Sequence, residues 1–409
     1  MLRRVLTTAA ILTFVVGPNW SLPPGADEKH AHPADDTASS ALGYDPKNLA
    51  FVNSRDSSDL TLIDTTTDTV VRRIPLGEYS NSHMAMVSHD GKKILVSATG
   101  RNRFLVVDIA TGKIEKTVVT GHSPEHFDMS PDGRLAFVGN IQDSTVSVID
   151  LHEGRELRRV SGFYEPHGFS VLPDGSKVYV SSLGAHEVAV LDPTGLMRKR
   201  LAVGNVGRFA ARDPQRYLSE IKGVVHPTLT KDGNFAYAAS SDSGELVIID
   251  TRTDRVLKTM KIGDQPWRPY LSPDGRWMLV PNNGDSTVAV VSVESQKIAA
   301  KLNAGTEMTG VNYALDGSKA YVISRGDSTV YVYDMKTFGL LTRLKIGVNL
   351  ALETAATSAD GKKVFLASST NDSVYVIDAT TDRVSRIADV GHFPWGVHIY
   401  GSASGNYCH

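Results

Sequence analysis

The sequence predicts an all-β fold: an eight-bladed β-propeller of four-stranded blades, closed by pairing of the N- and C-terminal strands. Three observations lead to this prediction. A module of about 42 residues recurs along the chain, two independent markers give the same spacing, and both ends of the repeat region carry incomplete modules. A period of this length, divided among four short strands, is typical of a propeller blade.

The two markers are a turn and a strand end. The turn is an Asp-Gly pair, which tolerates the positive φ of a tight hairpin, and it begins at Asp90, Asp132, Asp174, Asp232, Asp274, Asp316 and Asp360. The strand ends fall at Asp64, Asp108, Asp150, Asp192, Asp250, Ser292, Asp334 and Asp378. The first series is spaced by 42, 42, 58, 42, 42 and 44 residues, and the second by 44, 42, 42, 58, 42, 42 and 44. Both series therefore contain one insertion in the same place.

Each module supplies four strands in a fixed order. Strand A precedes the Asp-Gly pair, strand B follows it, strand C ends at the second marker, and strand D ends at a glycine such as Gly121. Apolar residues alternate within the strands, as expected where one face is buried. The segment Leu49 to Leu76 provides B, C and D, and Pro394 to Tyr400 resembles the missing A. Joined, they complete an eighth blade and remove the open sheet edges.

The N-terminus has the pattern of an export signal. Arg3 and Arg4 precede an apolar stretch, Val5 to Val16, which is too short to span a bilayer. We expect a signal peptide at 1–26, a flexible leader at 27–44, the propeller at 45–401 and a tail at 402–409, with no membrane span after signal removal. The single cysteine, Cys408, excludes an intrachain disulfide. These features predict a periplasmic, secreted or cell-surface protein.

The connectors from strand D to the next strand A should all open on one rim, where the innermost strands begin. The sixth and seventh positions before each Asp-Gly pair, with their counterparts in the closing segment, supply the predicted ligand-binding residues His83, His126, His167, His226, Trp267, Arg268, Glu353 and Trp395. Imidazoles suit borderline metals, and arginine with tryptophan suits a flat anion. The alternative is a wet channel in which these histidines bind only water.

Outside the rim positions, the sequence contains one insertion and two short groups of metal-binding residues at the chain ends. The insertion Gly204 to Ile221 carries Arg208, Arg212 and Arg216, and is either a solvated loop or a lid over the rim. His30-x-His32 and Cys408-His409 could bind copper or zinc at the chain ends. The sequence has no Cys-x-x-Cys-His motif, nucleotide-binding glycine loop or nucleophile elbow. We therefore predict no catalytic residue, and the net charge of −2 argues against nucleic-acid binding.

The repeats resemble a known family. STVSVIDLHEG, STVAVVS, STVYVYD and SVYVIDATTDRV, each after an SPDG-like turn, are similar to the YVTN-type β-propeller repeat over about Leu49 to Tyr400. Proteins with this repeat include bacterial surface and periplasmic propellers, and the eight-bladed haem domain of cytochrome d1-type nitrite reductase. The latter resemblance implies an iron tetrapyrrole held at the channel mouth by histidines and basic residues, for which His83, His126, His167, His226 and Arg268 occupy suitable positions.

Three hypotheses follow. The first is an exported binding or scaffold protein whose His, Arg and Trp residues bind a small ligand or a protein partner at the rim. The second is a haem d1-like tetrapyrrole- or metal-binding oxidoreductase, or a protein that assembles such a cofactor. The third is a purely structural envelope protein. The sequence does not decide whether haem or a transition metal is bound.

Overall fold

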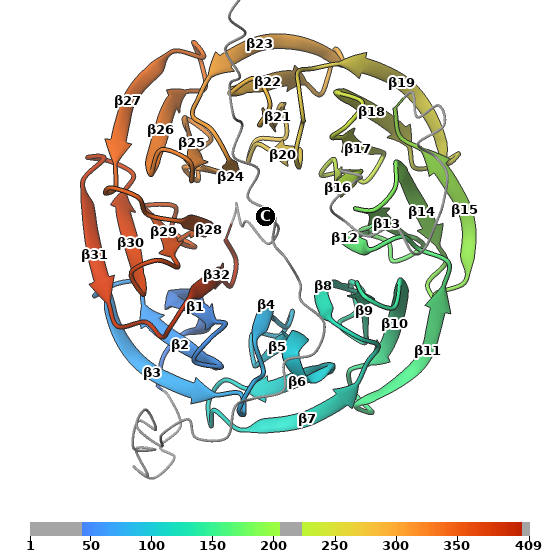
Figure 1. Ribbon diagram of the computed structural model, residues 1–409, viewed down its shortest axis with the longest axis vertical. Coiled ribbons are helices and arrows are strands. Elements are labelled where there is room, and N and C mark those ends of the chain that lie inside the picture. Colours follow the sequence, from blue (N-terminus) through green and yellow to red (C-terminus); the bar gives the residue numbers. More distant parts are fainter. Residues whose placement is uncertain (1–42, 205–222, 403–409) are drawn as a thin grey trace, which may run out of the picture. The chain divides into compact units, whose positions relative to one another are not determined.

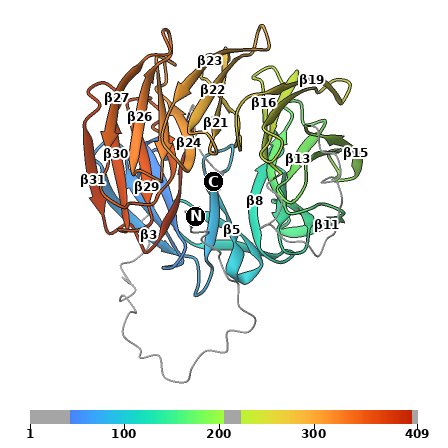
Figure 2. The same cartoon turned by 45° about the horizontal axis from the view of Figure 1, so that its top comes forward.

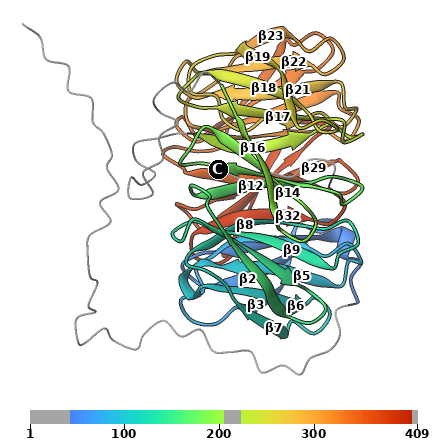
Figure 3. The same ribbon diagram turned by 90° about the vertical axis from the view of Figure 1, so that its right-hand side faces the viewer.

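The computed structural model describes residues 43–204 and 223–402, which form eight four-stranded antiparallel sheets around a common axis (Figure 1). The prediction of an eight-bladed propeller is confirmed. Figure 2 and Figure 3 show the same sheets tilted and from the side. The predicted signal peptide (1–26), residues 27–42 of the predicted leader, the insertion after Gly204 and the last seven residues lie outside the described residues.

The first four blades follow the predicted order of strands. The closing blade contains β1 (Leu49–Ser54), β2 (Asp59–Asp64), β3 (Thr69–Pro75) and β32 (Pro394–Ile399), preceded by the 3-10 helix η1 (Pro46–Asn48). Blade 2 contains β4 (Ser82–Val87), β5 (Lys93–Ala98), β6 (Arg103–Asp108) and β7 (Ile114–Val119), with the 3-10 helix η2 (Thr99–Arg101) after β5. Blade 3 contains β8 (Pro124–Met129), β9 (Leu135–Asn140), β10 (Thr145–Asp150) and β11 (Arg155–Ser161). Blade 4 contains β12 (Pro166–Val171), β13 (Val178–Ser182), β14 (Glu187–Leu191) and β15 (Met197–Ala202).

The remaining four blades repeat this arrangement. Blade 5 contains β16 (Val224–Leu229), β17 (Phe235–Ser240), β18 (Glu245–Asp250) and β19 (Arg255–Lys261). Blade 6 contains β20 (Tyr270–Leu271), β21 (Trp277–Asn282), β22 (Thr287–Ser292) and β23 (Lys297–Asn303). Blade 7 contains β24 (Met308–Tyr313), β25 (Lys319–Ser324), β26 (Thr329–Asp334) and β27 (Leu340–Lys345). Blade 8 contains β28 (Leu352–Thr357), β29 (Lys363–Ser368), β30 (Ser373–Asp378) and β31 (Val384–Ala388).

The closing blade joins the two ends of the propeller as predicted. β32 is antiparallel to β1, with Ala50 opposite Ile399 and Val52 opposite Val397. Each blade has one inner strand, and in the closing blade this strand comes from the far end of the sequence (Figure 1). The pairing covers the inner edge of β1, and β32 becomes the inner strand of the closing blade.

The hydrophobic core is divided among the joints between blades. Eight clusters of buried apolar side chains each combine residues from two neighbouring blades. Strands alternate their side chains between two faces, so one strand contributes to the clusters on both sides of its blade. In β1, for example, Phe51 packs towards blade 2, whereas Val52 packs towards blade 8. The ring thus needs all of its joints to bury its apolar surface.

Lysine side chains add polar ties across some of these joints. The Nζ of Lys363 in β29 donates to the carbonyl oxygen of Thr65 and to the carboxylate of Asp68, each at 2.8 Å, in the closing blade. Lys177 makes the same pair of contacts from blade 4 to blade 5, and Lys319 from blade 7 to blade 8. These side chains are only partly exposed. Their hydrogen bonds therefore lie in surroundings that strengthen them.

We expect Lys363→Met to destabilise the propeller by about 1–3 kcal/mol, because it removes two charge-assisted hydrogen bonds at the closing joint. The measurement is chemical denaturation of the purified chain. Lys362→Met is the matched control: its side chain is 73% exposed and lies 3.8 Å from Asp360. That control should change the free energy of unfolding by less than about 0.5 kcal/mol. Equal effects of the two substitutions would contradict the role of the tie.

Candidate functional site: the rim where the inner strands begin

Four predicted site histidines lie near the start of four consecutive inner strands, β4, β8, β12 and β16. We call His83, His126, His167 and His226 the histidine belt. Figure 1 shows these strands next to one another around the axis. His83, His126 and His167 are 9%, 2% and 4% exposed, and His226 is half-buried. One imidazole per blade thus reaches the same end of the propeller.

The rings of His83, His126 and His167 contact one another in series. The ring centroids of His83 and His126 are 4.6 Å apart and nearly perpendicular, and those of His126 and His167 are 4.0 Å apart. On the other side, the ring of Trp395 in β32 lies 5.5 Å from that of His83. The structure therefore brings together Trp395 and three of the four histidines as a row of aromatic rings. His167 continues the row by donating from Nδ1 to the carbonyl oxygen of Val225, next to His226, at 3.0 Å.

A local irregularity of the inner strands explains how these side chains converge. In seven blades the pairing of the inner strand with its neighbour shifts register close to the rim, as between Pro124 and Phe127 in β8. Such a shift re-aims side chains that would otherwise alternate strictly. Glu125 and His126 are consecutive, yet both lie close to His83: each of the three offers one ligand atom, and these atoms lie within 4.8 Å of one another.

The two sides of the belt differ in charge. On one side, Nε2 of His83 lies 3.8 Å from the Glu125 carboxylate. Burial raises the pKa of Glu125 to about 7, although the charge of Arg55 opposes this shift, while the Glu165 carboxylate adds to it. At the other end, burial lowers the pKa of His226 well below its usual value, and the positive charge of Arg268 lowers it further. Burial likewise lowers the pKa of His167 to about 4.

Two arginines approach the belt from its ends. The guanidinium of Arg268, just before β20, lies 5.3 Å from the ring centre of Tyr270. Its Nε and Nη1 atoms are buried, and within the described part of the chain they have no hydrogen-bond partner. Arg55, in the turn after β1, stacks on Trp395 at 4.6 Å and donates from Nε to Asn81 at 2.8 Å. The buried Nε and Nη1 donors of Arg268 are costly unless an acceptor binds them.

The other predicted site residues lie at the same end of the inner strands but have different surroundings. Trp267 is half-buried beside Arg268, and its backbone N–H donates to the carbonyl oxygen of Pro281 at 2.8 Å. Glu353 in β28 is fully buried. Its carboxylate lies 3.4 Å from Nη1 of Arg325 and accepts a hydrogen bond from Ser369. Burial raises the pKa of Glu353, and Arg325 opposes this shift. Glu353 and Arg325 thus form an ion pair that joins blade 8 to blade 7.

The predicted site left out two residues of this region, Arg55 and Glu125. Arg55 lies in a turn between two strands of the closing blade, outside the positions counted back from Asp-Gly pairs. Glu125 is the seventh residue before Asp132, but it adjoins His126 and would point the opposite way in a regular strand. The available signal of an irregular strand start was the alternation of the belt histidines between the seventh and sixth positions before their Asp-Gly pairs.

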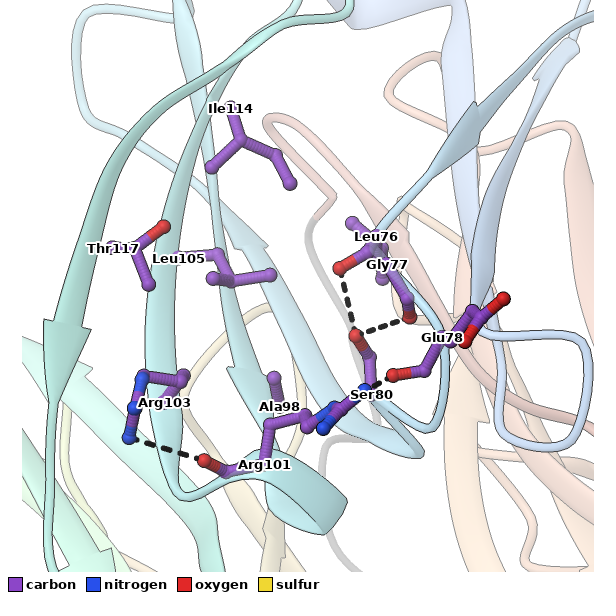
Figure 4. A pocket seen from close by; sticks show the side chains of 10 residues that line it. All are labelled: Leu76, Gly77, Glu78, Ser80, Ala98, Arg101, Arg103, Leu105, Ile114 and Thr117. Atoms are coloured by element: carbon purple, nitrogen blue, oxygen red, sulfur yellow. Dashed lines mark hydrogen bonds between the residues drawn. The ribbon is translucent and has the colours of Figure 1, made fainter.

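A surface hollow lies away from the belt, between the end of β3 and blade 2 (Figure 4). Leu76, Leu105 and Ile114 provide apolar walls, and Arg101 donates from Nε to the Glu78 carbonyl oxygen at 2.8 Å. Arg103 in turn donates to the Arg101 carbonyl oxygen at 3.2 Å. The lining contains neither histidine nor cysteine, and its guanidinium groups contact backbone oxygens, so the belt remains the better candidate site.

The fold and the belt together define an eight-bladed β-propeller with a histidine- and arginine-containing axial rim. Residues 44–166 match the family model of the cytochrome D1 heme domain, and residues 216–404 match that of the YNCE-like β-propeller. The resemblance to the d1-type haem domain that the repeats indicated is thereby confirmed. None of the curated proteins matches this chain.

Solved structures share this fold at low sequence identity. The dihydro-heme d1 dehydrogenase NirN, in complex with DHE, is 18% identical with a TM-score of 0.70, covering 87% of this chain and 76% of that one. Hydrazine synthase of Kuenenia stuttgartiensis is 19% identical with a TM-score of 0.54, covering 76% of this chain and 96% of that one. A putative 6-phosphogluconolactonase of Bacteroides fragilis is 16% identical with a TM-score of 0.54, covering 73% and 94%. These similarities establish the fold, which serves several chemistries.

We expect Arg325→Met to destabilise the chain by roughly 2 kcal/mol, because it leaves the buried Glu353 carboxylate without its cation. The expected loss of stability is smaller than for a fully buried ion pair because the Arg325 side chain is 36% exposed. Thermal and chemical denaturation measure the effect. Lys336→Met changes an exposed cation of the same blade and should be nearly neutral. Adding Glu353→Gln to Arg325→Met should restore part of the loss; no recovery would contradict the pairing.

Proposed function

We propose that this propeller binds an iron tetrapyrrole of the haem d1 type at the axial rim, with His226 and Arg268 as its principal contacts. The observation that carries the proposal is the buried, unpartnered guanidinium edge of Arg268 beside a row of imidazoles. The match of residues 44–166 to the cytochrome D1 heme domain supports it. So does the similarity to a structure described as containing DHE, although at 18% identity that similarity by itself shows the fold alone.

The residues at this end of the belt fit such a ligand. A tetrapyrrole carries carboxylates, and a carboxylate would satisfy the Nε and Nη1 donors of Arg268. His226 is the half-buried member of the belt, so its imidazole is the easiest for a ligand to reach. Because burial and Arg268 lower its pKa, the ring is neutral near pH 7 and keeps a lone pair for a metal. When bound, the tetrapyrrole would supply redox chemistry at its iron.

The other parts of the proposal concern location and partners. Arg3, Arg4 and the apolar stretch after them support export to the periplasm or cell surface. No helix within residues 43–204 and 223–402 is long and apolar enough to cross a membrane. A protein partner at the same rim, as expected for a carrier in cofactor assembly, stays a prediction. The absence of a recognised catalytic motif favours binding or carriage over turnover.

The test is absorption spectroscopy of the purified chain titrated with haemin and with haem d1. We expect saturable binding with a shifted Soret band. Arg268→Ala should weaken binding by about tenfold or more, the equivalent of one charge-assisted hydrogen bond. His226→Ala should change the band itself, because it removes the imidazole assigned to the iron.

His152→Ala is the matched control, since the His152 side chain is 87% exposed on an outer turn. This variant should bind both tetrapyrroles with the wild-type spectrum. The proposal is wrong if His226→Ala and Arg268→Ala variants, shown to be folded by circular dichroism, bind as the wild type does. It is equally wrong if neither tetrapyrrole binds the wild-type chain saturably.

A further inference from the structure

We propose that His83, Glu125 and His126 form a mononuclear site for a divalent transition metal, with Zn²⁺ as the expected ion. The site lies at the joint between blades 2 and 3, on β4 and β8. It is distinct from the tetrapyrrole position assigned to His226 and Arg268, and it does not depend on that assignment. Either site can therefore fail in experiment without the other.

The geometry of the three side chains is close to what a metal requires. One ligand atom of each residue lies within 4.8 Å of the others, and Nε2 of His83 is 3.8 Å from the Glu125 carboxylate. Ligands of a tetrahedral zinc are separated by roughly 3.3 Å, as follows from bond lengths of about 2.0–2.2 Å. A contraction of up to about 1.5 Å between ligand atoms, made by side-chain rotations, would complete the set. Two imidazoles and a carboxylate leave a fourth position for water.

The backbone that carries the ligands is held from both sides. Asn53 of the closing blade, which is 2% exposed, donates from Nδ2 to the carbonyl oxygens of Ser82 and His83 at 3.1 and 3.0 Å. Ser97 in β5 is fully buried; its Oγ accepts from the Met84 N–H at 3.0 Å and donates to the Glu125 carbonyl oxygen at 2.6 Å. One hydroxyl thus fixes β4 relative to β8. Outer contacts of this kind orient metal ligands.

The chemistry of the three ligands selects the class of ion. Imidazole nitrogens with one carboxylate suit Zn²⁺, Co²⁺, Ni²⁺ and Cu²⁺, whereas Ca²⁺ and Mg²⁺ prefer all-oxygen surroundings. The Glu125 carboxylate supplies the negative charge that a buried cation needs. The three side chains therefore suit a divalent transition metal.

The experiment uses the full chain with the chain-end histidines and cysteine replaced. His30, His32, Cys408 and His409 could bind metal by themselves, so His30→Ala, His32→Ala, Cys408→Ser and His409→Ala define the reference background. After chelator treatment, the protein is titrated with Zn²⁺ by calorimetry and with Co²⁺ by visible absorption. We expect one equivalent to bind, and saturating Zn²⁺ to raise the melting temperature. Glu125→Gln and His126→Ala should each weaken binding by about 100-fold or more.

Two serines provide a matched pair that separates ligand positioning from folding. Ser181 in β13 makes the same clamp between blades 4 and 5, accepting from the Gly168 N–H and donating to the Val225 carbonyl oxygen, each at 2.8 Å. Ser97→Ala should weaken Zn²⁺ binding by about tenfold or more, whereas Ser181→Ala should leave it unchanged. The His152→Ala and Arg268→Ala variants should also retain one equivalent.

Three outcomes would overturn the site. The first is a reference background that binds no Zn²⁺, which would place any wild-type binding at the chain ends. The second is Zn²⁺ binding by the folded Glu125→Gln and His126→Ala variants that is as tight as that of the background. The third is loss of both Zn²⁺ and tetrapyrrole binding in Arg268→Ala, which would mean that a single site had been divided wrongly into two.

Discussion

The pairing of β32 with β1 is the constraint on which the rest of the structure depends. The hydrophobic clusters lie between blades, so an open chain would expose the apolar side chains that the closing blade shares with blade 8. The closing blade also holds the rim in place. Its Asn53 bonds the backbone of Ser82 and His83 in blade 2, and its Ser54 and Thr61 donate to the Val390 carbonyl oxygen after blade 8. The position of the first belt histidine is thus set by residues from both ends of the repeat region.

The fold could be predicted from the sequence because the repeated residues perform a local task that leaves a regular trace. Most of the strand-ending aspartates accept hydrogen bonds from backbone N–H groups two and three residues later, as Asp150 does from His152 and Glu153 at 2.9 Å. Where the series has a serine, Ser292, its hydroxyl accepts from the Ser295 N–H at 3.1 Å and preserves the turn. These contacts need no distant partner, so they recur with the period of the blade. Their count therefore equals the count of blades.

The candidate site could be predicted only in part, because it is assembled from different blades. The inner-strand positions of His83, His126, His167 and His226 followed from the period, and the structure places the first three in ring contact. Which neighbours join them depends on register shifts at the start of the inner strands, and a repeat pattern does not encode those shifts. Glu125 lies near His83 for that reason. Glu353 occupies an equivalent position, but a cation from the adjacent blade lies next to its carboxylate.

The two ends of the histidine belt differ in their charged groups. At one end Glu125 interacts with both Glu165 and Arg55, and at the other burial and the charge of Arg268 lower the pKa of His226. The two ends are linked by ring contacts, since His126 touches both His83 and His167. A shift of His126 towards a metal would change its contact with His167, which is bonded through Val225 to the strand of His226. Because linkage between two sites is reciprocal, any effect of one ligand on the affinity for the other would act equally in both directions. The row of rings, more than any single imidazole, is therefore the feature that gives this rim its potential for chemistry.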